Sequence, residues 1–375
     1  MGRPKIAYIL FDFHLSGMSS WIYRLASRLK NDFDFHFLAT RVPQITDRFH
    51  SIGNAKYIGP KPLDLIKYLT KNSIDIVQYA NGRIHGECAM AARVPVVIER
   101  TDGLRSGSAL ESKSGLDAVI ASTKGTASLI KKIMPPEKIH LIYNGIDINY
   151  LEDVKPERLN FDNNKLIIGR ASRITRGKRI DLLISAFEKL EKKYPEIRLV
   201  IVGGDSKVPG SEKVIKNLKA MAAHLNDKVV FTGSVEDPLQ LIKGFDIGTC
   251  VSEADNEGIP NSLIESMALS QPVVTTDTGD VRELIQNGYN GYVVPHNKGK
   301  IAKALETFIT NSVLRRKMGT AAKETIKNKF SIETQAIKYK HLYLNLLESK
   351  LSTISIYRRS INYLFKLFYR KFFVN

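Results

Sequence analysis

Two glutamates stand eight positions apart in the stretch DNEGIPNSLIESM, residues 255–267. Glu257 precedes a proline, and Glu265 follows that proline by five positions within an apolar helical pattern. Proline suits the first turn of a helix, and the free backbone amides of that turn attract anions. Five residues of helix span about 7–8 Å. A diphosphate at the helix start would therefore have a carboxylate on either side, which is the layout needed for a nucleotide sugar.

The residues at this helix start would surround the same ligand. Asn261 or Ser262 can cap the helix, because their side-chain oxygens accept hydrogen bonds from free backbone amides. One carboxylate can then bind the hydroxyls of a sugar, and the other those of a ribose. The alternative from spacing alone is a solvated loop glutamate and a surface helix glutamate, neither of which contacts a ligand.

Basic residues crowd the stretch GRASRITRGKRID, where five of them fall within ten positions: Arg170, Arg173, Arg176, Lys178 and Arg179. A guanidinium offers a planar fork to phosphate oxygens, and an ammonium offers a point charge. Such groups can stabilise the charge that develops on a leaving diphosphate, so the chemistry needs no metal ion. The alternative is a basic loop that only faces solvent.

A glycine turn follows the first apolar run of the chain, in the stretch SGMSS. Gly17 permits close backbone approach, and Ser16 or Ser19 can cap the helix that follows. This turn is not the GxGxxG fingerprint of a dinucleotide site, and neither VGGD at residues 202–205 nor any other stretch supplies one. The sequence contains no Walker-type phosphate loop either.

Short β-branched runs alternate with helical patterns along most of the chain, which predicts parallel, doubly wound α/β sheets. The series stops at YLEDVKPERLNFDNN, a polar stretch that indicates a linker, and a second series begins at KLIIGRAS. We therefore expect an N-terminal domain over residues 1–155, a C-terminal domain with a closing helix over residues 156–345, and a tail over residues 346–375. Ligands in such folds bind beyond the carboxyl ends of the strands.

The composition is that of a globular protein with a sizeable core, with 43% hydrophobic and 25% charged residues among 375. No apolar run reaches the roughly 18 residues of a membrane-spanning helix. The N-terminal run is interrupted by Asp12 and His14, which indicates a first strand and not a signal peptide. Cys88 and Cys250 offer neither a disulfide framework nor metal-ligand spacing, which fits a cytoplasmic protein. The net charge of +18 predicts a surface that attracts phosphates.

The segment EGIPNSLIESMALSQPVVTTDTGDVRELIQNGYNGYVVP resembles the signature of the family-four glycosyltransferases, most of which retain anomeric configuration. The resemblance extends to LIYNGID at residues 141–147 and to GRASRITRGKRIDLLISAF at residues 169–187, and it covers most of the chain. It implies the GT-B fold, in which two doubly wound Rossmann-like domains face each other across a cleft. The spacing of the two glutamates together with the downstream TDTGDVREL is its most specific part.

The resemblance implies a role for each matching residue of the donor site. Arg173 and Lys178 match the pair that binds the donor diphosphate. Glu257 matches the glutamate that contacts the transferred sugar, and Glu265 matches the one that binds the ribose. Together, Glu257, Arg173 and Lys178 are the expected catalytic residues.

Further donor contacts follow from the same resemblance. Gly17 matches the glycine turn through which the N-terminal domain approaches the donor phosphates. The stretch VVFTGS would lie by the nucleotide base, at Val230 and Phe231. Backbone amides would meet the phosphates or the sugar at Gly258, Ile259, Asn261 and Ser262.

The sequence departs from the family pattern at three places. Arg179 stands where the family commonly has glycine, and Gly17 lacks the second glycine that often accompanies it. Many members carry a histidine after the strand that VPVVIER matches, where this chain has Thr101 and Asp102. A backbone or hydroxyl contact is one replacement for that imidazole, and His14 or His85 is another.

The expected activity is transfer of a hexose-type sugar from a UDP- or GDP-sugar to a glycan acceptor, with no cofactor. Attack on the face of the leaving group is the working mechanism, because no carboxylate is assigned as a covalent nucleophile. A GT-B nucleotide-sugar epimerase is one alternative, since it would use the same donor site without an acceptor. A nucleic-acid-binding protein is the other, but only the charge suggests it, and we expect no nucleic-acid partner.

The tail combines basic and aromatic residues in SIYRRSINYLFKLFYRKFF, residues 355–373. Residues 350–375 carry six basic side chains and no acidic one. A basic, aromatic amphipathic helix can lie on an anionic membrane surface. The alternatives are packing on the N-terminal domain or on a partner protein. A membrane contact would suit an enzyme with a lipid-linked acceptor at the inner face of a bacterial plasma membrane, as in the synthesis of capsule or lipopolysaccharide.

Overall fold

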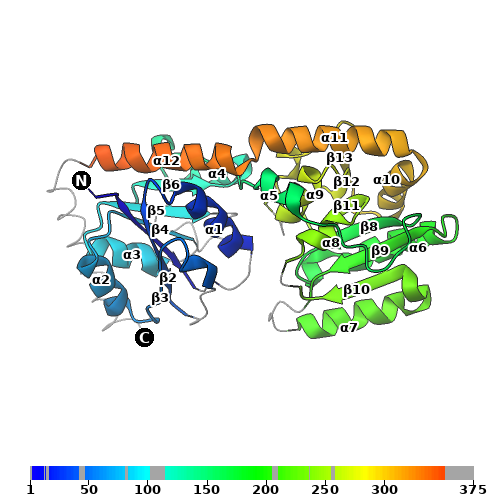
Figure 1. The fold of residues 1–375 in the computed structure, drawn as a ribbon, viewed down its shortest axis with the longest axis horizontal. Helices are drawn as coiled ribbons and strands as arrows, with labels where there is room; N and C mark the ends of the chain where they lie inside the picture. Colours follow the sequence, from blue (N-terminus) through cyan, green and yellow to red (C-terminus); the bar gives the residue numbers. More distant parts are fainter. Residues whose placement is uncertain are drawn as a thin grey trace. The chain divides into compact units, whose positions relative to one another are not determined.

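The computed structural model describes residues 2–11, 13, 17–41, 47–80, 83–101, 115–204, 210–235, 237–254 and 258–350. The chain divides into two compact units. The N-terminal unit combines Met1–Gly145 with Ile332–Asn375, and the C-terminal unit is Ile146–Ser331. Each unit is an α/β domain built on one parallel sheet, so the prediction of two doubly wound domains is confirmed (Figure 1).

The N-terminal unit has a seven-stranded sheet in the order β3-β2-β1-β4-β5-β6-β7. Its neighbouring strands all pair in parallel. The strands are β1 Lys5–Leu10, β2 Asp34–Ala39, β3 Asn54–Tyr57, β4 Ile76–Ala80, β5 Val96–Thr101, β6 Ala118–Ala121 and β7 Ile139–Leu141. The helices are α1 Gly17–Leu29, α2 Pro62–Lys71, α3 Arg83–Ala91, α4 Lys124–Ile130 and α12 Ile332–Glu348, with short 3-10 turns at Asp47–Phe49 and Pro136–Lys138.

The C-terminal unit has a six-stranded sheet in the order β10-β9-β8-β11-β12-β13, again with parallel neighbours. The strands are β8 Leu166–Ala171, β9 Ile197–Val202, β10 Val229–Gly233, β11 Ile247–Cys250, β12 Val273–Thr276 and β13 Gly291–Val294. The α-helices are α5 Ile148–Asp153, α6 Ile180–Glu191, α7 Ser211–Ala222, α8 Leu239–Lys243, α9 Asn261–Ala268, α10 Lys298–Thr310 and α11 Ser312–Lys329. Short 3-10 turns lie at η4 Arg176–Lys178, Ala223–Lys228 and Val281–Glu283.

The strand order of each sheet reverses once, between β1 and β4 in the N-terminal unit and between β8 and β11 in the C-terminal unit. At such a point the connections on the two sides leave in opposite directions, which opens a crevice beyond the carboxyl ends of the two strands. Ligands of open α/β sheets bind there. The reversal between β8 and β11 therefore marks the edge of the C-terminal sheet at which a site is expected.

The closing helix α12 packs on the N-terminal unit, so the expectation that it completes the C-terminal domain is wrong. It lies against α1, and its apolar residues join the core of the N-terminal sheet (Figure 1). Tyr339 and Tyr343 are fully buried there. The sequence shows the helical period of α12 but not which sheet its apolar face covers.

The predicted linker is also misplaced. The units divide between Gly145 and Ile146, and the stretch YLEDVKPERLNFDNN belongs to the C-terminal unit. Lys243 donates hydrogen bonds to the carbonyls of Leu151 and Glu152, each at 2.8 Å. These contacts hold the polar stretch to α8, although its composition resembles that of a free linker.

Hydroxyl groups connect α12 to the sheet beneath it. Tyr343 Oη donates to Gln78 Oε1 at 2.7 Å, and it lies 2.7 Å from Tyr8 Oη. Because Tyr343 has only one proton to donate, Tyr8 is the donor to Tyr343. Arg100 Nη1 donates to Tyr339 Oη at 2.9 Å, with its guanidinium 4.1 Å from the centre of the Trp21 ring.

Replacing Tyr343 by Phe is expected to destabilise the N-terminal unit by about 1–3 kcal/mol, because the buried Tyr8 hydroxyl loses its acceptor. Trp21 is the single tryptophan of the chain and is buried in this unit, so urea unfolding followed by its fluorescence reports on the unit. Tyr57→Phe, at an exposed tyrosine of β3, is the matched control. An equal unfolding midpoint for Tyr343→Phe and the control would contradict the expectation.

Candidate active site

The predicted donor residues lie on loops that leave the carboxyl edge of the C-terminal sheet at its reversal point. The loop that carries Arg173 and Lys178 follows β8, and the loop that leads into α9 follows β11. These two strands are neighbours in the sheet. The loops also touch, since the amide of Glu253 donates to the carbonyl of Gly177 at 2.9 Å. The structure thus brings together the basic loop and the α9 loop, which are about 80 residues apart in sequence.

The structure separates the five basic residues of this loop by what they contact. Arg170 is buried, with its guanidinium donating to the carbonyl of Thr249 and to Ser252 Oγ. Arg179 binds Asp181 through two hydrogen bonds. Arg173 and Arg176 are exposed, and Lys178 is half-buried at the end of η4. The structure therefore sets the buried Arg170 and the paired Arg179 apart from the exposed Arg173 and Arg176.

Arg179 also accounts for one departure from the family pattern. Its φ is 43° and its ψ is 41°, which is the left-handed region that glycine adopts at little cost. A glycine would suit this position between η4 and α6, whereas the arginine adopts this backbone conformation at a cost in free energy. The bonds from its guanidinium to Asp181 in the first turn of α6 oppose that cost.

Helix α9 begins at Asn261, and Pro260 is its N-cap residue. Proline has no side-chain oxygen to accept from the first amides, and the N-cap position lies one residue before Asn261 and two before Ser262, the residues expected to cap the helix. Helix α9 packs closely on β11 at Gly248. A Cβ added to this glycine would stand only 2.6 Å from Ser266 Oγ in the helix. Glu265 is half-buried in the second turn of α9, and Glu257 lies outside the described residues.

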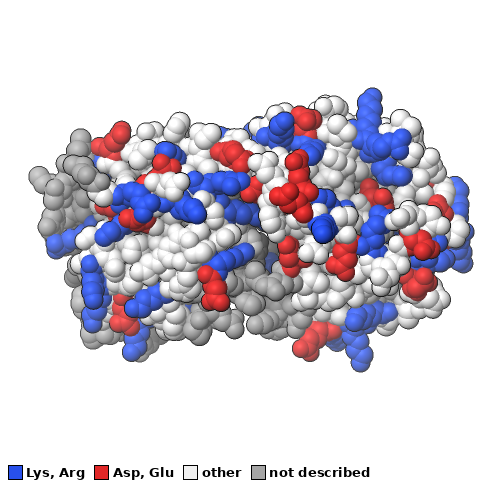
Figure 2. Space-filling model, viewed as in Figure 1, with Lys and Arg blue, Asp and Glu red and all other residues white. Residues whose placement is uncertain are grey.

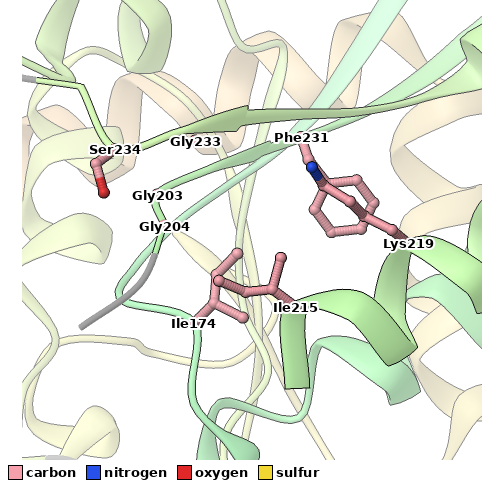
Figure 3. Close-up of a pocket in the computed structure, with 8 residues that line it drawn as sticks. All are labelled: Ile174, Gly203, Gly204, Ile215, Lys219, Phe231, Gly233 and Ser234. Carbon is pink, nitrogen blue, oxygen red and sulfur yellow. The ribbon is translucent and has the colours of Figure 1, made fainter. Parts of the chain in front are cut away.

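A pocket of about 180 Å³ opens at the same edge of the C-terminal sheet (Figure 3). Glycines form its floor at the ends of β9 and β10, and the side chains of Phe231 and Ile215 flank it. Figure 3 draws Phe231 and Lys219 toward one end of the pocket and Ser234 at the other end. The residues that line the pocket are Ile174, Gly203, Gly204, Ile215, Lys219, Phe231, Gly233 and Ser234.

The pocket suits one flat apolar ring. A cavity of about 150 Å³ lined by apolar side chains is large enough for a benzene-sized ring. Ile174 lines the pocket and follows Arg173 in the basic loop. The groups attached to a ring in this pocket would therefore lie near that loop. Phe231 lines the pocket and Val230 does not, since successive side chains of a strand point to opposite faces. Contact of either residue with a base stays a prediction.

For three other residues with predicted donor contacts, the structure gives only their positions. Gly17 is the first residue of α1, directly beyond the β1 edge where the N-terminal sheet reverses. Gly258 and Ile259 are half-buried just before α9. The amide of Asp280 donates to the carbonyl of Gly258 at 3.1 Å. Their contacts with a donor stay predictions.

The residues considered as substitutes for the family histidine differ in accessibility. Thr101 is buried at the end of β5, while Asp102 and His14 lie outside the described residues. His85 is only 2% exposed, in the first turn of α3. Its imidazole offers no exposed edge to a ligand in this structure, so its proposed role gains no support.

The tautomer of His85 follows from its partner. Thr40 Oγ1 donates its proton to the carbonyl of Leu10 at 3.1 Å, so the His85 Nε2 that lies 3.1 Å from Thr40 Oγ1 must carry a hydrogen. The other ring nitrogen, Nδ1, has no hydrogen-bond partner among the described residues. Burial, and next the nearby charge of Arg41, lower the pKa of His85 from 6.5 to about 4.

This pKa predicts an acid-sensitive N-terminal unit. Between pH 6.5 and pH 4 the unfolded chain takes up a proton at His85 that the folded unit excludes, so stability is lost as the pH falls. The loss from this residue is about 3 kcal/mol at pH 4, from 1.36 kcal/mol per pKa unit. Urea unfolding followed by Trp21 fluorescence at both pH values should show that His85→Gln reduces this difference. The rest includes His36 and His140 of the same unit, because burial lowers the pKa of each of them as well. The exposed His50→Gln should keep the whole difference, and equal pH dependence in both variants would refute the assignment.

Among the described residues, no group of three or more His, Cys, Asp or Glu is placed to hold a metal ion. The expectation of metal-independent chemistry stays a prediction. No helix in the described part of the chain is long and apolar enough to cross a membrane. On the face drawn in Figure 2, basic and acidic side chains are interspersed over both units, without one continuous basic surface.

Two family models match this chain along most of its length. Residues 15–150 match the model described as Glycosyltransferase Family 4, and residues 152–325 match the model described as Glycosyl transferases group 1. With the two Rossmann-like sheets, these matches define the class: the chain is built from the two domains of a GT-B glycosyltransferase. The prediction of a glycosyltransferase is confirmed at this level.

Curated relatives are similar to part of the chain. An N-acetyl-alpha-D-glucosaminyl L-malate synthase of Bacillus anthracis is 26% identical over 239 residues, which is 62% of this chain and 60% of the relative. A capsular polysaccharide biosynthesis glycosyltransferase, CapM of Staphylococcus aureus, is 29% identical over 188 residues, 47% of this chain and 48% of the relative. The matched region thus spans less than two thirds of the length of these relatives.

Solved structures share the fold over nearly the whole chain. A glycosyltransferase from Rickettsia africae superposes with a TM-score of 0.79 at 19% identity, covering 92% of this chain and 99% of that one. HepE from Anabaena, in complex with UDP and glucose, superposes with a TM-score of 0.76 at 18% identity, covering 92% and 100%. Identities this low establish the GT-B fold and nothing finer.

Proposed function

We propose that this protein transfers a sugar from a nucleoside-diphosphate sugar to a glycan acceptor in the synthesis of a bacterial surface polysaccharide. One observation carries the proposal: the basic loop after β8, the start of α9 after β11 and the one-ring pocket all lie at the reversal edge of the C-terminal sheet. These parts match the diphosphate, the sugar and the base of a single ligand. The relatives reported above include a capsular polysaccharide glycosyltransferase.

The proposed nucleotide is UDP. The pocket, with a volume of about 180 Å³, has room for one ring such as uracil. The HepE structure, which shares the fold, contains UDP and glucose. Phe231 would pack against the base, and contacts of this kind contribute about 1–3 kcal/mol per base.

The chemistry assigned to the site is a group transfer. The bond between the sugar C1 and the diphosphate oxygen breaks, and a bond between C1 and an acceptor hydroxyl oxygen forms. The hydroxyl proton passes to the departing diphosphate oxygen when attack occurs on the face of the leaving group, with retention of configuration. Arg173, Lys178 and the amides at the start of α9 stabilise the negative charge of that leaving group without a metal ion.

The acceptor side of the proposal comes from the sequence near the end of the chain. A lipid-linked acceptor at the inner face of the plasma membrane is inferred from the basic, aromatic segment at residues 355–373, which lies outside the described residues. Capsule or lipopolysaccharide synthesis is the corresponding pathway class. The epimerase alternative has no support from the relatives reported above.

The proposal is tested by a thermal-shift screen of the full chain against UDP, GDP, UDP-glucose, UDP-N-acetylglucosamine and GDP-mannose. A ligand at 100 times its Kd stabilises the folded state by about 2.7 kcal/mol, which raises Tm by several degrees. We expect UDP and one UDP-sugar to raise Tm, and that UDP-sugar to be slowly hydrolysed. Phe231→Ala should lower the UDP shift, with the exposed Tyr289→Ala as the control. No shift with any nucleotide would contradict the donor site.

A further inference from the structure

One ionisable side chain, that of Lys219, lines the one-ring pocket in the described part of the chain. Lys219 is exposed, and its ammonium makes no hydrogen bond or ion pair with the described residues. By contrast, Lys193 and Lys228 of the same unit each pair with a glutamate, at 2.7 Å and 2.6 Å. A lysine can lay its apolar stem along a pocket while its ammonium offers three donors. The donors of Lys219 can therefore bind a ligand in the pocket.

The pocket has an inner end, which lies away from the carboxyl edge of the sheet. Strand β10 ends at Gly233, and Phe231 lies two residues earlier, about 6–7 Å further from that edge. Because β9 and β10 are parallel neighbours, α7 in the connection between them runs back from the carboxyl edge. Lys219 follows Ile215 by one turn of α7, so it too lies further from the edge, by about 6 Å. Two separate elements thus place Phe231 and Lys219 at the inner end, and Figure 3 draws them toward one end of the pocket.

The opposite end of the pocket, formed by glycine backbone, is joined to the basic loop. The amide of Ile174, the residue after Arg173, donates to the carbonyl of Gly204 at 3.2 Å. A Cβ added to Gly203 would stand 1.9 Å from the carbonyl oxygen of Ser172, so the glycine backbone packs directly on this loop. The ribose and diphosphate of a donor would leave the pocket at this glycine end, because the cations of the basic loop lie beyond it.

This direction determines which edge of a pyrimidine would face Lys219. The ring nitrogen that carries the ribose and the carbon C4 lie opposite each other in a pyrimidine ring. With the ribose at the glycine end, the substituent on C4 points to the inner end. Uracil carries an acceptor oxygen, O4, at this position, whereas cytosine carries an amino donor there. An ammonium only donates, so it can bind the oxygen but not the amino group.

We propose that Lys219 is a specificity-determining residue of the donor site: its ammonium donates to O4 of uracil and selects a uridine over a cytidine nucleotide. The inference rests on the proposed function. Phe231 would pack on the face of the base, and such contacts accept any base because every base has a π-face. The discrimination between the two pyrimidines is therefore assigned to Lys219 and not to Phe231.

The test is calorimetric titration of the full chain with UDP and with CDP, which differ only in the base. Lys219→Met keeps a long apolar stem and loses the ammonium. Lys216→Met is the matched control, because Lys216 is also an exposed lysine of α7 but does not line the pocket. The measured quantity is the ratio of the Kd of CDP to the Kd of UDP. Both nucleotides carry the same diphosphate, so an effect of overall charge cancels in this ratio.

We expect the wild type and Lys216→Met to bind UDP about 10-fold more tightly than CDP. Lys219→Met should bring the two Kd values within about twofold of each other, mainly by weakening the binding of UDP. A merely structural role of Lys219, or a contact of its ammonium with phosphate, would instead weaken both nucleotides equally and leave the ratio unchanged.

Two results would overturn the inference: a wild type that binds CDP at least as tightly as UDP, or a ratio in Lys219→Met equal to that of the wild type. The proposed function fails differently, through a wild type that binds no nucleoside diphosphate, and the inference falls with it. Binding of UDP by the wild type without a preference over CDP overturns the role of Lys219 alone.

Discussion

Replacing Glu257 by Gln is expected to lower donor turnover by about 10²–10³-fold, while UDP affinity changes little. The carboxylate would accept hydrogen bonds from hydroxyls of the transferred sugar, and a preorganised group of this kind contributes about 10²–10³ in kcat. UDP lacks that sugar and keeps its contacts with the basic loop and the pocket. Turnover is measured as hydrolysis of UDP-glucose or UDP-N-acetylglucosamine, and affinity by calorimetric titration with UDP.

The control for this prediction is Glu253→Gln, the same substitution four positions earlier. The Glu253 side chain is exposed, and only its backbone takes part in the contacts described above. It should hydrolyse the donor at close to the wild-type rate. If Glu257→Gln retained wild-type turnover, the sugar would be held by other groups and the assignment of Glu257 would be wrong.

Replacing Arg173 or Lys178 by Ala is expected to weaken UDP binding by about 10- to 100-fold each. A hydrogen bond to a charged group contributes about 1.5–3 kcal/mol, and every 1.4 kcal/mol is tenfold in Kd. Calorimetric titration with UDP at fixed ionic strength gives the comparison.

Arg176→Ala separates a specific contact from the effect of net charge. Arg176 is an exposed cation of the same short loop, so its loss changes the overall charge equally. We expect it to weaken UDP binding by less than about threefold, as for an exposed and screened charge. Equal losses in all three variants would show that the loop attracts phosphate only through its overall charge.

The sequence predicts the strands that form continuous apolar runs, but it does not predict β2, β3 and β13. The buried parallel strands β1 and β9 show such runs, IAYIL in β1 and LVIV in β9. Strand β2 interrupts its apolar residues with a histidine and begins with an aspartate, and the edge strand β3 has no buried residue. Strand β13 is only four residues long. Short or edge strands bury too little surface on both faces to leave a clear pattern.

The candidate site is predictable in part, because its residues follow strands. The stretch after β8 and the start of α9 are both recognised from local patterns, and parallel strands bring their ends to one edge. Two features were not predictable. Ile215 and Lys219 reach the pocket from α7, where their spacing is that of an ordinary amphipathic helix. The hydrogen bonds from the hydroxyl of Thr278 to the carbonyls of Glu253 and Ala254 depend on a chain segment more than 20 residues away.

The placement of α12 shows the same limit at a larger scale. Its period predicts a helix, but its core partners are Trp21, Phe33 and Tyr8, about 300 residues earlier. Only the three-dimensional structure shows which sheet supplies them. The apolar face of a helix indicates that the helix packs against another element, but it does not identify that element.

We propose that the nucleotide binds at the carboxyl edge of the C-terminal sheet, along the strands β10, β9, β8 and β11. Hydrogen exchange of the full chain, with and without saturating UDP, tests it most directly. We predict slower exchange in the segments 172–179, 203–204, 231–234 and 258–265, which include Lys178 and Phe231, and a smaller effect when Lys178 is replaced by Ala. Unchanged exchange in these segments, with UDP bound by calorimetry, would contradict the account.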